Sequence, residues 1–556
     1  MKTDYQKIAE LLYKNNKYTV NEIEKMYPKR NLKPGAEVTR FAPSPTGFLH
    51  LGHFFQTVID KFLALRSGGI FYYRLEDTDK KREVEGADKF AYDKICEYGF
   101  VPDEGWTVDG EKGSYGPYRQ SERIEIYKAY GKMLVEKGNA FPCFCDAPEN
   151  KEEILESREK QLEETSTLLD HDPCRDLSYE EVKANIDAGK TFALRLRSKN
   201  REGDKIKIID KVRGERELPA NLRDAVLIKS DGIPPYPFAH PIDDHLMHTT
   251  TVVRGEEWFP SVALHTEIFD ALGFERVSYL HTAVISKIDE KTGNKRKFSK
   301  RLDPEFNINY FDEQGYPKTA VLEYVLTLAN SNFEDWRKAN PDVNLFDFPF
   351  TIEKMGTNSP MFDLVKLGDI SKNVFSRMKA SEVYTGALEW AKTYNKKFYE
   401  LLTNNRDLAI KALNIDREIQ RPRKDISKYS DIELLYSYMF DELFDKSTLL
   451  NFDEKLMKET IKEFLSEYKK VLNLNENKDE WFNKIKEVAN NCGFATDNKL
   501  YKQNPTLYKG NTADACNIIR VSITGRSQTP DLYSIMVTLG QNKVLERINY
   551  VLNNLK

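Results

Sequence analysis

Apolar and polar positions follow two alternating periods between residues 37 and 118. Val38–Arg40 and Gly69–Leu75 are short runs rich in β-branched and aromatic residues, and they predict strands. His53–Arg66 and Ala87–Tyr98 carry helical patterns. The strand–helix–strand–helix order is typical of a parallel sheet with crossover helices, so we expect an α/β fold with a Rossmann-like parallel-sheet domain.

This rhythm changes between residue 119 and about residue 230. A charged helical stretch at Asn150–Glu164 and strand-like runs at Thr191–Leu196 and Lys205–Val212 predict an inserted α+β domain. Sheet signals then return, as strands at Val226–Lys229, Thr250–Val253 and Val277–Leu280 and a helix at Ser261–Leu272. The pattern therefore predicts one sheet interrupted by an insert.

Both ends of the chain have helical character. Residues 1 to 36 predict one or two helices that stop at the turn-rich Asn31–Gly35, and charged helices fill the chain from about residue 377. The predicted division is a helical extension at 1–36, a parallel-sheet domain at 37–118 and 231–288, an insert at 119–230, a further domain at 289–376, and helical subdomains at 377–450 and 451–556.

Composition narrows the class of protein. The 556 residues suggest about three to five domains, and 40% hydrophobic with 31% charged residues fit a globular chain. No apolar run approaches the roughly 18 residues that span a bilayer, and no signal-peptide core opens the sequence, so we expect no membrane association and a cytoplasmic location. A net charge of −4 argues against indiscriminate coating of nucleic acid.

The stretch FAPSPTGFLHLGH, residues 41–53, follows the first predicted strand. Its prolines and glycines exclude a strand or helix interior, so a stiff turn should lead into a helix that begins near Leu51. A helix start binds phosphate readily, and His50 and His53 would lie there, with Gly52 leaving room for a nucleotide. From these residues alone, a tight turn with two half-buried histidines is the other interpretation.

A short basic tract, Lys297-Phe298-Ser299-Lys300-Arg301, follows a later strand and loop. Two lysines three residues apart on a loop can close over a triphosphate and stabilise the charge that develops on it. A solvated basic loop is the alternative.

Together these stretches resemble the class I aminoacyl-tRNA synthetases. His50-Leu51-Gly52-His53 is similar to their HIGH motif, and Lys297–Arg301 is similar to their KMSKS motif. Residues 40–53, 73–79 (YRLEDTD), 118–127 (YRQSERIEIY) and 243–258 (DDHLMHTTTVVRGEEW) resemble the glutamyl-tRNA synthetase family, and residues 518–548 resemble its bacterial form. The resemblance implies that the insert holds the acceptor end, that 289–376 contacts the stem, and that the helical half binds the anticodon.

The resemblance also implies roles for individual residues. Catalytic groups would be His50, His53, Lys297 and Lys300. ATP, with Mg²⁺, would bind at Gly52, His53, Glu257, Trp258, Lys297 and Lys300. L-Glutamate would bind at Arg40, Ala42, Ser44, Glu76, Tyr236, His240 and Arg254.

Within that glutamate pocket, Glu76 would meet the ammonium group, while Arg40 and Arg254 would meet carboxylates with help from Tyr236. Which arginine meets the γ-carboxylate stays open. His240 stands where relatives tend to carry Asn or a small residue. It could contact the substrate and add pH dependence near neutrality, or point elsewhere.

The resemblance suggests two further sites. Cys143, Cys145 and Cys174, with His171 as a fourth ligand, could hold a structural Zn²⁺, and three reduced thiols are the alternative. The candidate tRNA contacts are Arg421, Arg423, Lys424 and Arg520.

The expected function is a glutamate–tRNA ligase that activates glutamate with ATP, once tRNA is bound, and transfers it to the 3′ end of tRNA(Glu). Whether tRNA(Gln) is also a substrate stays open, and we expect a monomer. A glutaminyl enzyme, whose family branch ends in β-barrels, fits the helical C-terminal half less well. A shortened paralogue would lack that half, and an inactive RNA-binding core would not need intact HLGH and KFSKR motifs.

Overall fold

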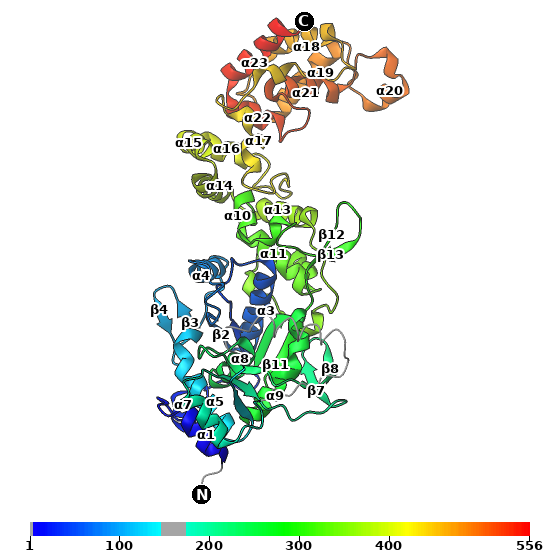
Figure 1. Ribbon diagram of the computed structural model, residues 1–556. Coiled ribbons are helices and arrows are strands. Elements are labelled where there is room, and N and C mark those ends of the chain that lie inside the picture. The colour runs from blue at the N-terminus through cyan, green and yellow to red at the C-terminus, as the bar shows by residue number, and fades with distance from the viewer. Residues whose placement is uncertain (1–3, 146–173) are drawn as a thin grey trace. The chain divides into compact units, whose positions relative to one another are not determined.

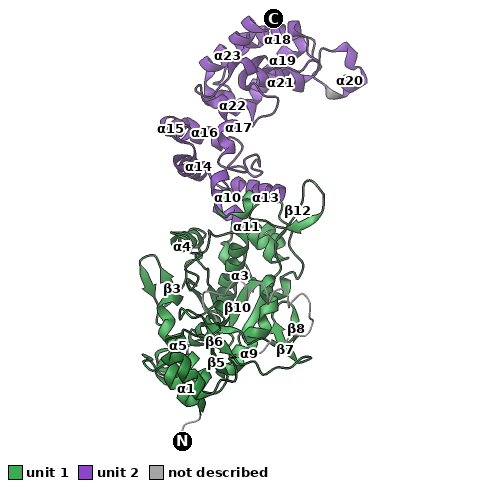
Figure 2. Cartoon of the chain, viewed as in Figure 1, with its two compact units in different colours: residues 1–310, 322–363 green, residues 311–321, 364–556 purple. Residues whose placement is uncertain are grey.

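The computed structural model describes residues 4–145 and 174–556. The chain divides into two compact units, coloured green and purple in Figure 2. Unit 1 comprises residues 1–310 and 322–363, and unit 2 comprises residues 311–321 and 364–556. Each unit is described by itself below.

Unit 1 is built on two four-stranded sheets with mostly parallel strands (Figure 1). The first has the order β1–β2–β3–β4 and the second β10–β11–β7–β8. Their bounds are β1 Val38–Phe41, β2 Ile70–Tyr73, β3 Glu104–Thr107, β4 Gly110–Lys112, β7 Lys205–Asp210, β8 Gly214–Pro219, β10 Thr251–Gly255 and β11 Ser278–Thr282. Only β4 and β8 run antiparallel to their neighbours.

The two sheets meet at the beginnings of β1 and β10. The Thr250 N–H donates to the Val38 carbonyl at 2.9 Å, and the Val38 N–H donates to Thr250 Oγ1 at the same distance. The strand beginnings therefore lie together, and residues at the ends of β1 and β10 line one cavity, described below.

Unit 1 also contains helices. They are α1 Asp4–Leu12, α2 Val20–Met26, α3 Leu51–Ser67, α4 Ala87–Glu97, α5 Ile124–Glu136, α7 Tyr179–Asp187, α8 Tyr236–Leu246, α9 Val262–Leu272 and α12 Phe333–Ala339. Of these, α3 packs on β1, β2 and β10. The predicted strands and helices of residues 37–118 are present, which confirms the α/β fold class. The helix α8 was not predicted, because Pro237 and Pro241 interrupt its helical pattern.

The predicted insert contains a separate antiparallel sheet of β5 (Ala140–Cys143), β6 (Ala193–Leu196) and β9 (Val226–Ile228). The amino-terminal helices α1 and α2 share the apolar core of this region and pack on α5. One expected insert strand differs, because β7 joins β11 of the main sheet through Asp210 and Tyr279. The predicted helix at Asn150–Glu164 lies outside the described residues.

The stretch after the main sheet carries a hairpin and several helices. The hairpin pairs β12 (Ser286–Ile288) with β13 (Lys295–Lys297), and α10 (Asn309–Gln314) and α11 (Lys318–Ala329) follow it in the chain. The hairpin is in unit 1, whereas α10 and α11 each contribute residues to both units.

Helices dominate the described residues of unit 2 around an apolar core, as predicted from residue 377 onward. They are α13 Leu364–Arg377, α14 Ala380–Tyr394, α15 Lys396–Asn404, α16 Arg406–Asn414, α17 Asp431–Leu435, α18 Lys458–Val471, α19 Lys478–Asn491, α20 Asn498–Gln503, α21 Thr512–Thr524, α22 Leu532–Leu539 and α23 Gln541–Asn554. Asn477 and Asn511 form capping boxes that fix the starts of α19 and α21.

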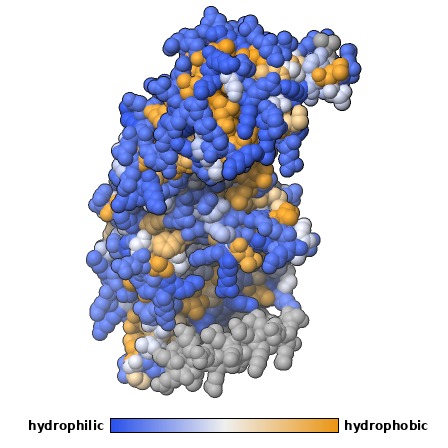
Figure 3. Space-filling view, turned by 90° about the horizontal axis from the view of Figure 1, so that it is seen from above, coloured by the Kyte–Doolittle hydropathy of each residue, from blue (hydrophilic) through white to orange (hydrophobic). Residues whose placement is uncertain are grey.

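No helix among the described residues is long and apolar enough to cross a membrane. Figure 3 shows hydrophilic side chains over most of the face in view, with apolar residues scattered between them.

Candidate active site

Two adjoining cavities open at the ends of the parallel strands in unit 1. The larger, of about 510 Å³, lies beyond β1 and β10. The smaller, of about 130 Å³, lies between the start of α3, the residues after β11 and the β12–β13 hairpin. Gln56 on α3 lines both, so the cavities share a wall. Ligands of open parallel sheets bind at this edge.

The turn before α3 presents its two histidines as predicted. His50 is the N-cap of α3, and its Nδ1 accepts the His53 backbone N–H at 3.2 Å. The rings stack with centroids 3.6 Å apart. A Cβ on Gly52 would lie 3.1 Å from the His50 ring, so glycine leaves that ring its place.

Both histidines are neutral at neutral pH. Burial lowers the pKa of His50 to about 2, with further contributions from His53 and Lys300, and burial lowers the pKa of His53 to about 4. Because His50 Nδ1 accepts a hydrogen bond, its Nε2 carries the proton and can donate one.

The basic tract lies against the same cavity. Lys297 lines the smaller cavity together with His50, and a Cβ on Gly47 would lie 3.4 Å from Lys300 Nζ. Phe298 anchors the tract, because it is buried and stacks on Phe362 with centroids 4.7 Å apart. The structure therefore brings positions 50 and 300 to one place.

Two predicted ATP residues lie on different walls. Glu257 lines the smaller cavity with Lys297, as expected. Trp258 instead lines the larger cavity, where its ring lies 4.8 Å from that of Tyr236. These residues are adjacent in a 3-10 helix, so their side chains point in different directions.

The larger cavity collects most of the predicted glutamate residues. Arg40, Ala42 and Ser44 come from the end of β1, Glu76 follows β2, Tyr236 opens α8 and Arg254 lies on β10. Strands far apart in the sequence thus end around one space.

Sequence reasoning missed the groups that hold these side chains. Arg74 donates to Glu76 at 2.8 Å and to Asp244 at 2.7 Å, and Arg40 Nε lies 3.4 Å from Asp244. Although burial alone would raise the pKa of Asp244, Arg74 and Arg40 hold it well below its usual value. Arg74 and Asp244 stand within the motifs at residues 73–79 and 243–258, where a charged residue next to apolar ones was the available signal.

Arg254 differs from the other buried arginines of the site. Arg40, Arg74 and Arg123 each pair with a carboxylate, whereas no ion pair joins Arg254 to a carboxylate among the described residues. The residue is 4% exposed, and its Nη2 has no hydrogen-bond partner among the described residues. A buried cation left without an anion favours a ligand that brings one.

His240 lies behind the cavity. It is fully buried, it contacts Asp244 and Tyr279 through its two ring nitrogens, and its ring stacks on Tyr236 at 5.2 Å. It is not among the residues that line the larger cavity. Burial lowers its pKa to about 4, which is the wrong range for the expected pH dependence near neutrality.

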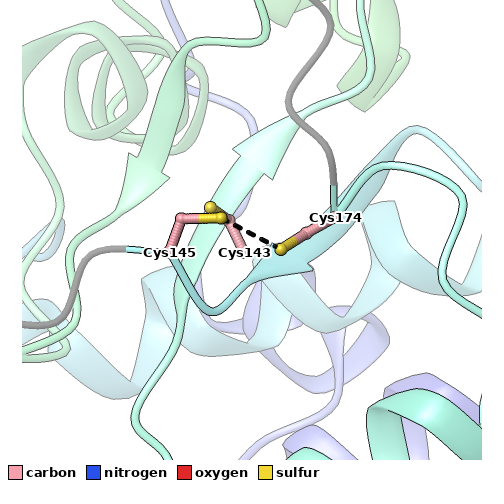
Figure 4. Close-up of side chains that lie close together, drawn as sticks. All are labelled: Cys143, Cys145 and Cys174. Carbon is pink, nitrogen blue, oxygen red and sulfur yellow. Dashed lines mark hydrogen bonds between the residues drawn. The ribbon is translucent and has the colours of Figure 1, made fainter. Parts of the chain in front are cut away.

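Three cysteines form the expected cluster in the insert region (Figure 4). The thiol sulfurs of Cys143, Cys145 and Cys174 all lie within 4.8 Å of one another, and Cys145 Sγ is 3.4 Å from Cys174 Sγ. The fourth predicted ligand, His171, lies outside the described residues.

The four predicted tRNA contacts in unit 2 have different surroundings. Arg421 and Lys424 are exposed. Arg423 instead donates to Asp425 at 2.8 Å and contacts Tyr436, and Arg520 donates to the Pro530 carbonyl at 3.0 Å. The latter two therefore stabilise loops of unit 2.

Comparisons with known proteins agree with this geometry. The family model "tRNA synthetases class I (E and Q), catalytic domain" matches residues 37–337, and "Anticodon binding domain" matches residues 511–552. The chain is thus a class I tRNA synthetase by its catalytic domain.

Individual relatives narrow the family. A glutamate–tRNA ligase of Clostridium perfringens (strain 13) is 44% identical over 98% of this chain and its own full length. One from Acetivibrio thermocellus is 42% identical over 99% of this chain and its own full length. A crystal structure of a glutamate tRNA ligase from Elizabethkingia meningosepticum, in complex with its amino acid, has a TM-score of 0.70 at 25% identity, covering 94% of this chain and 100% of that one. This chain belongs to the glutamate–tRNA ligase family, which confirms the resemblance predicted from its motifs.

Proposed function

We propose that this protein ligates glutamate to tRNA(Glu) in two steps at the paired cavities. ATP would occupy the smaller cavity and glutamate the larger. The observation that carries the proposal is Arg254, a buried cation with no carboxylate partner in the described part of the chain, in a cavity that adjoins one lined by His50 and Lys297. Such a pair suits an anionic amino acid and a nucleotide.

The charges around the larger cavity suggest one orientation of glutamate. Glu76 would hold the ammonium group, and Arg254, with Tyr236, would hold the γ-carboxylate. Arg40 would hold the α-carboxylate close to His53, on the side of the smaller cavity. A neutral glutamine amide would leave Arg254 without an anion, which disfavours it.

The nucleotide cavity would promote the first step by charge and position. His50 Nε2–H, His53, Lys297 and Lys300 would stabilise the triphosphate as the glutamate α-carboxylate attacks the α-phosphorus and pyrophosphate leaves. Glu257 is the single carboxylate among the described residues that line this cavity, so Mg²⁺ would be held mainly by phosphate and water oxygens. When bound, Mg²⁺ neutralises phosphate charge.

In the second step, the terminal ribose hydroxyl of the tRNA would attack the activated carbonyl, and AMP would leave. Positioning supplies most of this rate, and no protein nucleophile is needed. We propose that the region of residues 119–230 receives the acceptor end and that unit 2 binds the anticodon, with Arg421 and Lys424 as exposed contacts.

We also propose a structural zinc at Cys143, Cys145 and Cys174. Three thiol sulfurs within 4.8 Å of one another suit a tetrahedral ion. Elemental analysis of purified protein should find one zinc per chain, and Cys145→Ser should lower that content. If the purified wild-type protein contains no zinc, the proposal is wrong and the three cysteines are reduced thiols.

Aminoacylation tests the proposed function. Purified tRNA(Glu) and tRNA(Gln) are each offered glutamate or glutamine with ATP. Glutamate on tRNA(Glu) is the expected product, and glutamate on both RNAs would define a relaxed enzyme. Charging with glutamine alone would overturn the assignment, and pyrophosphate exchange without product would point to an incomplete reaction.

A further inference from the structure

The surroundings of Arg254 are unusual because, among the residues that the structure describes, the groups that hold it are neutral. Its Nε donates to His281 Nε2 at 3.1 Å, and its Nη1 donates to His265 Nδ1, also at 3.1 Å. The Tyr279 ring lies 4.4 Å from the guanidinium carbon. Two imidazoles and the face of the Tyr279 ring therefore hold the guanidinium on three sides, while its Nη2 has no hydrogen-bond partner among the described residues.

The hydrogen bonds also determine where the imidazole protons are. Arginine has no acceptor atom, so both histidines accept from it through unprotonated nitrogens. His281 then carries its proton on Nδ1, which donates to Asp210 Oδ2 at 2.7 Å. His265 carries its proton on Nε2, which has no hydrogen-bond partner among the described residues.

Backbone N–H groups, and not Arg254, stabilise the negative charge of Asp210. The backbone N–H groups of Val212 and Arg213 donate to its Oδ1 at 3.0 and 2.8 Å, and that of His281 donates to its Oδ2 at 3.0 Å. The carboxylate orients His281 but remains one imidazole ring away from Arg254.

A second pair repeats this arrangement. Asp244 contacts His240 Nδ1, and His240 Nε2 lies 3.1 Å from the Tyr279 hydroxyl. Here too a neutral imidazole separates a carboxylate from the side chain that contacts Arg254. Burial, together with Arg254, holds the pKa of His265 well below its usual value, and burial lowers the pKa of His281 despite Asp210.

We infer that His265 and His281 are specificity-determining positioning residues, which fix Arg254 as neutral acceptors so that its charge stays available to the substrate carboxylate. This inference rests on the proposed function. At position 265 an aspartate oxygen would stand where Nδ1 of His265 accepts, and at position 281 a glutamate oxygen would stand where Nε2 of His281 accepts. Either carboxylate would therefore reach the same guanidinium atoms and pair with them. The site would then hold its own anion and lose its preference for glutamate over glutamine.

A purely structural role makes a different prediction. If the histidines only filled space and accepted hydrogen bonds, an amide and a carboxylate side chain of the same shape would serve equally at each position, because both accept. If charge matters, they must differ. Asn and Asp match the Nδ1 of His265, and Gln and Glu match the Nε2 of His281, so the pairs His265→Asn with His265→Asp, and His281→Gln with His281→Glu, isolate charge at constant size.

The experiment measures KM and kcat for glutamate and glutamine in aminoacylation of tRNA(Glu) by the full chain. Each amide variant should lose several-fold in kcat/KM through imperfect positioning. Each carboxylate variant should lose about 100-fold more than its amide partner, mainly as a higher KM for glutamate. The glutamate-to-glutamine ratio of kcat/KM should fall by a similar factor in the carboxylate variants alone.

His245 supplies a matched control pair. Its ring stacks on Phe274 at 3.6 Å and contacts Glu24, away from Arg254. His245→Asn and His245→Asp should have equal glutamate KM values. Asp210→Asn adds an independent arm, because it leaves Arg254 and both histidines in place while removing the carboxylate that fixes the His281 tautomer. It should raise the KM for glutamate about tenfold, by loss of one oriented hydrogen bond.

The outcomes separate the inference from the proposed function. If the wild-type protein does not glutamylate tRNA, the proposed function fails first. If it does, and the carboxylate and amide variants at 265 and 281 lose glutamate activity equally, the inference is overturned. Thermal unfolding of every variant distinguishes misfolding from lost selectivity. Two positions and the Asp210→Asn arm keep the result decisive if one variant does not fold.

Discussion

The two units use buried arginine in opposite ways. In unit 1, Arg40, Arg74 and Arg123 pair with carboxylates, whereas Arg254 has no carboxylate partner among the described residues. In unit 2, the buried Arg547 donates to the backbone carbonyls of Ile523 and Tyr438 and lies over the Phe444 ring at 3.9 Å. These partners are uncharged, while the exposed Asp441 carboxylate lies 3.9 Å from its Nη2, at the limit of an ion pair.

Histidine shows the same contrast. All eight histidines stand at or before residue 281, and the residues of unit 2 contain none. Three of them, His240, His265 and His281, are fully buried. Burying titratable groups costs stability, so their accumulation around one cavity indicates a site organised for a charged ligand. Unit 2 instead closes around apolar side chains.

The largest expected effect removes the unpaired cation of unit 1. Arg254→Gln should lower kcat/KM for glutamate about 1000-fold, because the substrate carboxylate loses its buried partner. Steady-state aminoacylation measures it. Arg276→Gln, which breaks only the exposed pair with Asp270, is the control and should change little. Equal losses in both variants would contradict the role of Arg254.

The second largest expected effect is a difference between the two units in how their stability depends on pH. His50, His53 and His240 have pKa values lowered to about 2, 4 and 4, so below the unfolded value of about 6.5 the unfolded chain binds protons that the folded chain does not. Stability of unit 1 should therefore fall as pH drops from 6.5 toward 4, by about 1 kcal/mol for each histidine at pH 5.5. Calorimetry at several pH values should show the unit 1 transition moving down ahead of unit 2. Parallel shifts would argue against buried neutral histidines.

A smaller loss is expected from the basic tract. Lys300→Ala should slow tRNA-dependent pyrophosphate exchange about 100-fold, because one fixed charge near the triphosphate is lost. Lys295→Ala is the matched control, since Lys295 lies on β13 just before the basic tract but donates to the Ser359 carbonyl at 3.1 Å. If both alanine variants catalyse pyrophosphate exchange at the same rate, the proposed role of the Lys300 charge is wrong.

The smallest effect tests unit 2. Arg547→Met should lower the free energy of unfolding by about 2 kcal/mol, because two buried carbonyls lose their donor. The glutamate KM should stay unchanged, in contrast to Arg254→Gln. Lys543→Met, one turn earlier on α23 and more exposed, provides the comparison in denaturant unfolding. A raised KM for glutamate in Arg547→Met would contradict a purely structural role for this arginine.

Much of the site was predictable because its motifs are local. The turn before α3 and the Lys297–Arg301 tract carry their chemistry in a few adjacent residues, and the strands that precede them have clear apolar patterns. The positions of the Trp258 and His240 side chains were harder to predict: Trp258 lines the larger cavity instead of the smaller one, and His240 lies behind the larger cavity. The direction in which a side chain points depends on the helix that carries it.

The sequence alone determined the fold class, the family and the stretches that meet at the nucleotide cavity, because periodicity and motifs are properties of neighbouring residues. Only the tertiary structure decided which buried arginine lacks an anion. Asp244, Asp210 and the histidines that face Arg254 come from separate elements, and whether a charge is paired depends on distances that no local pattern contains.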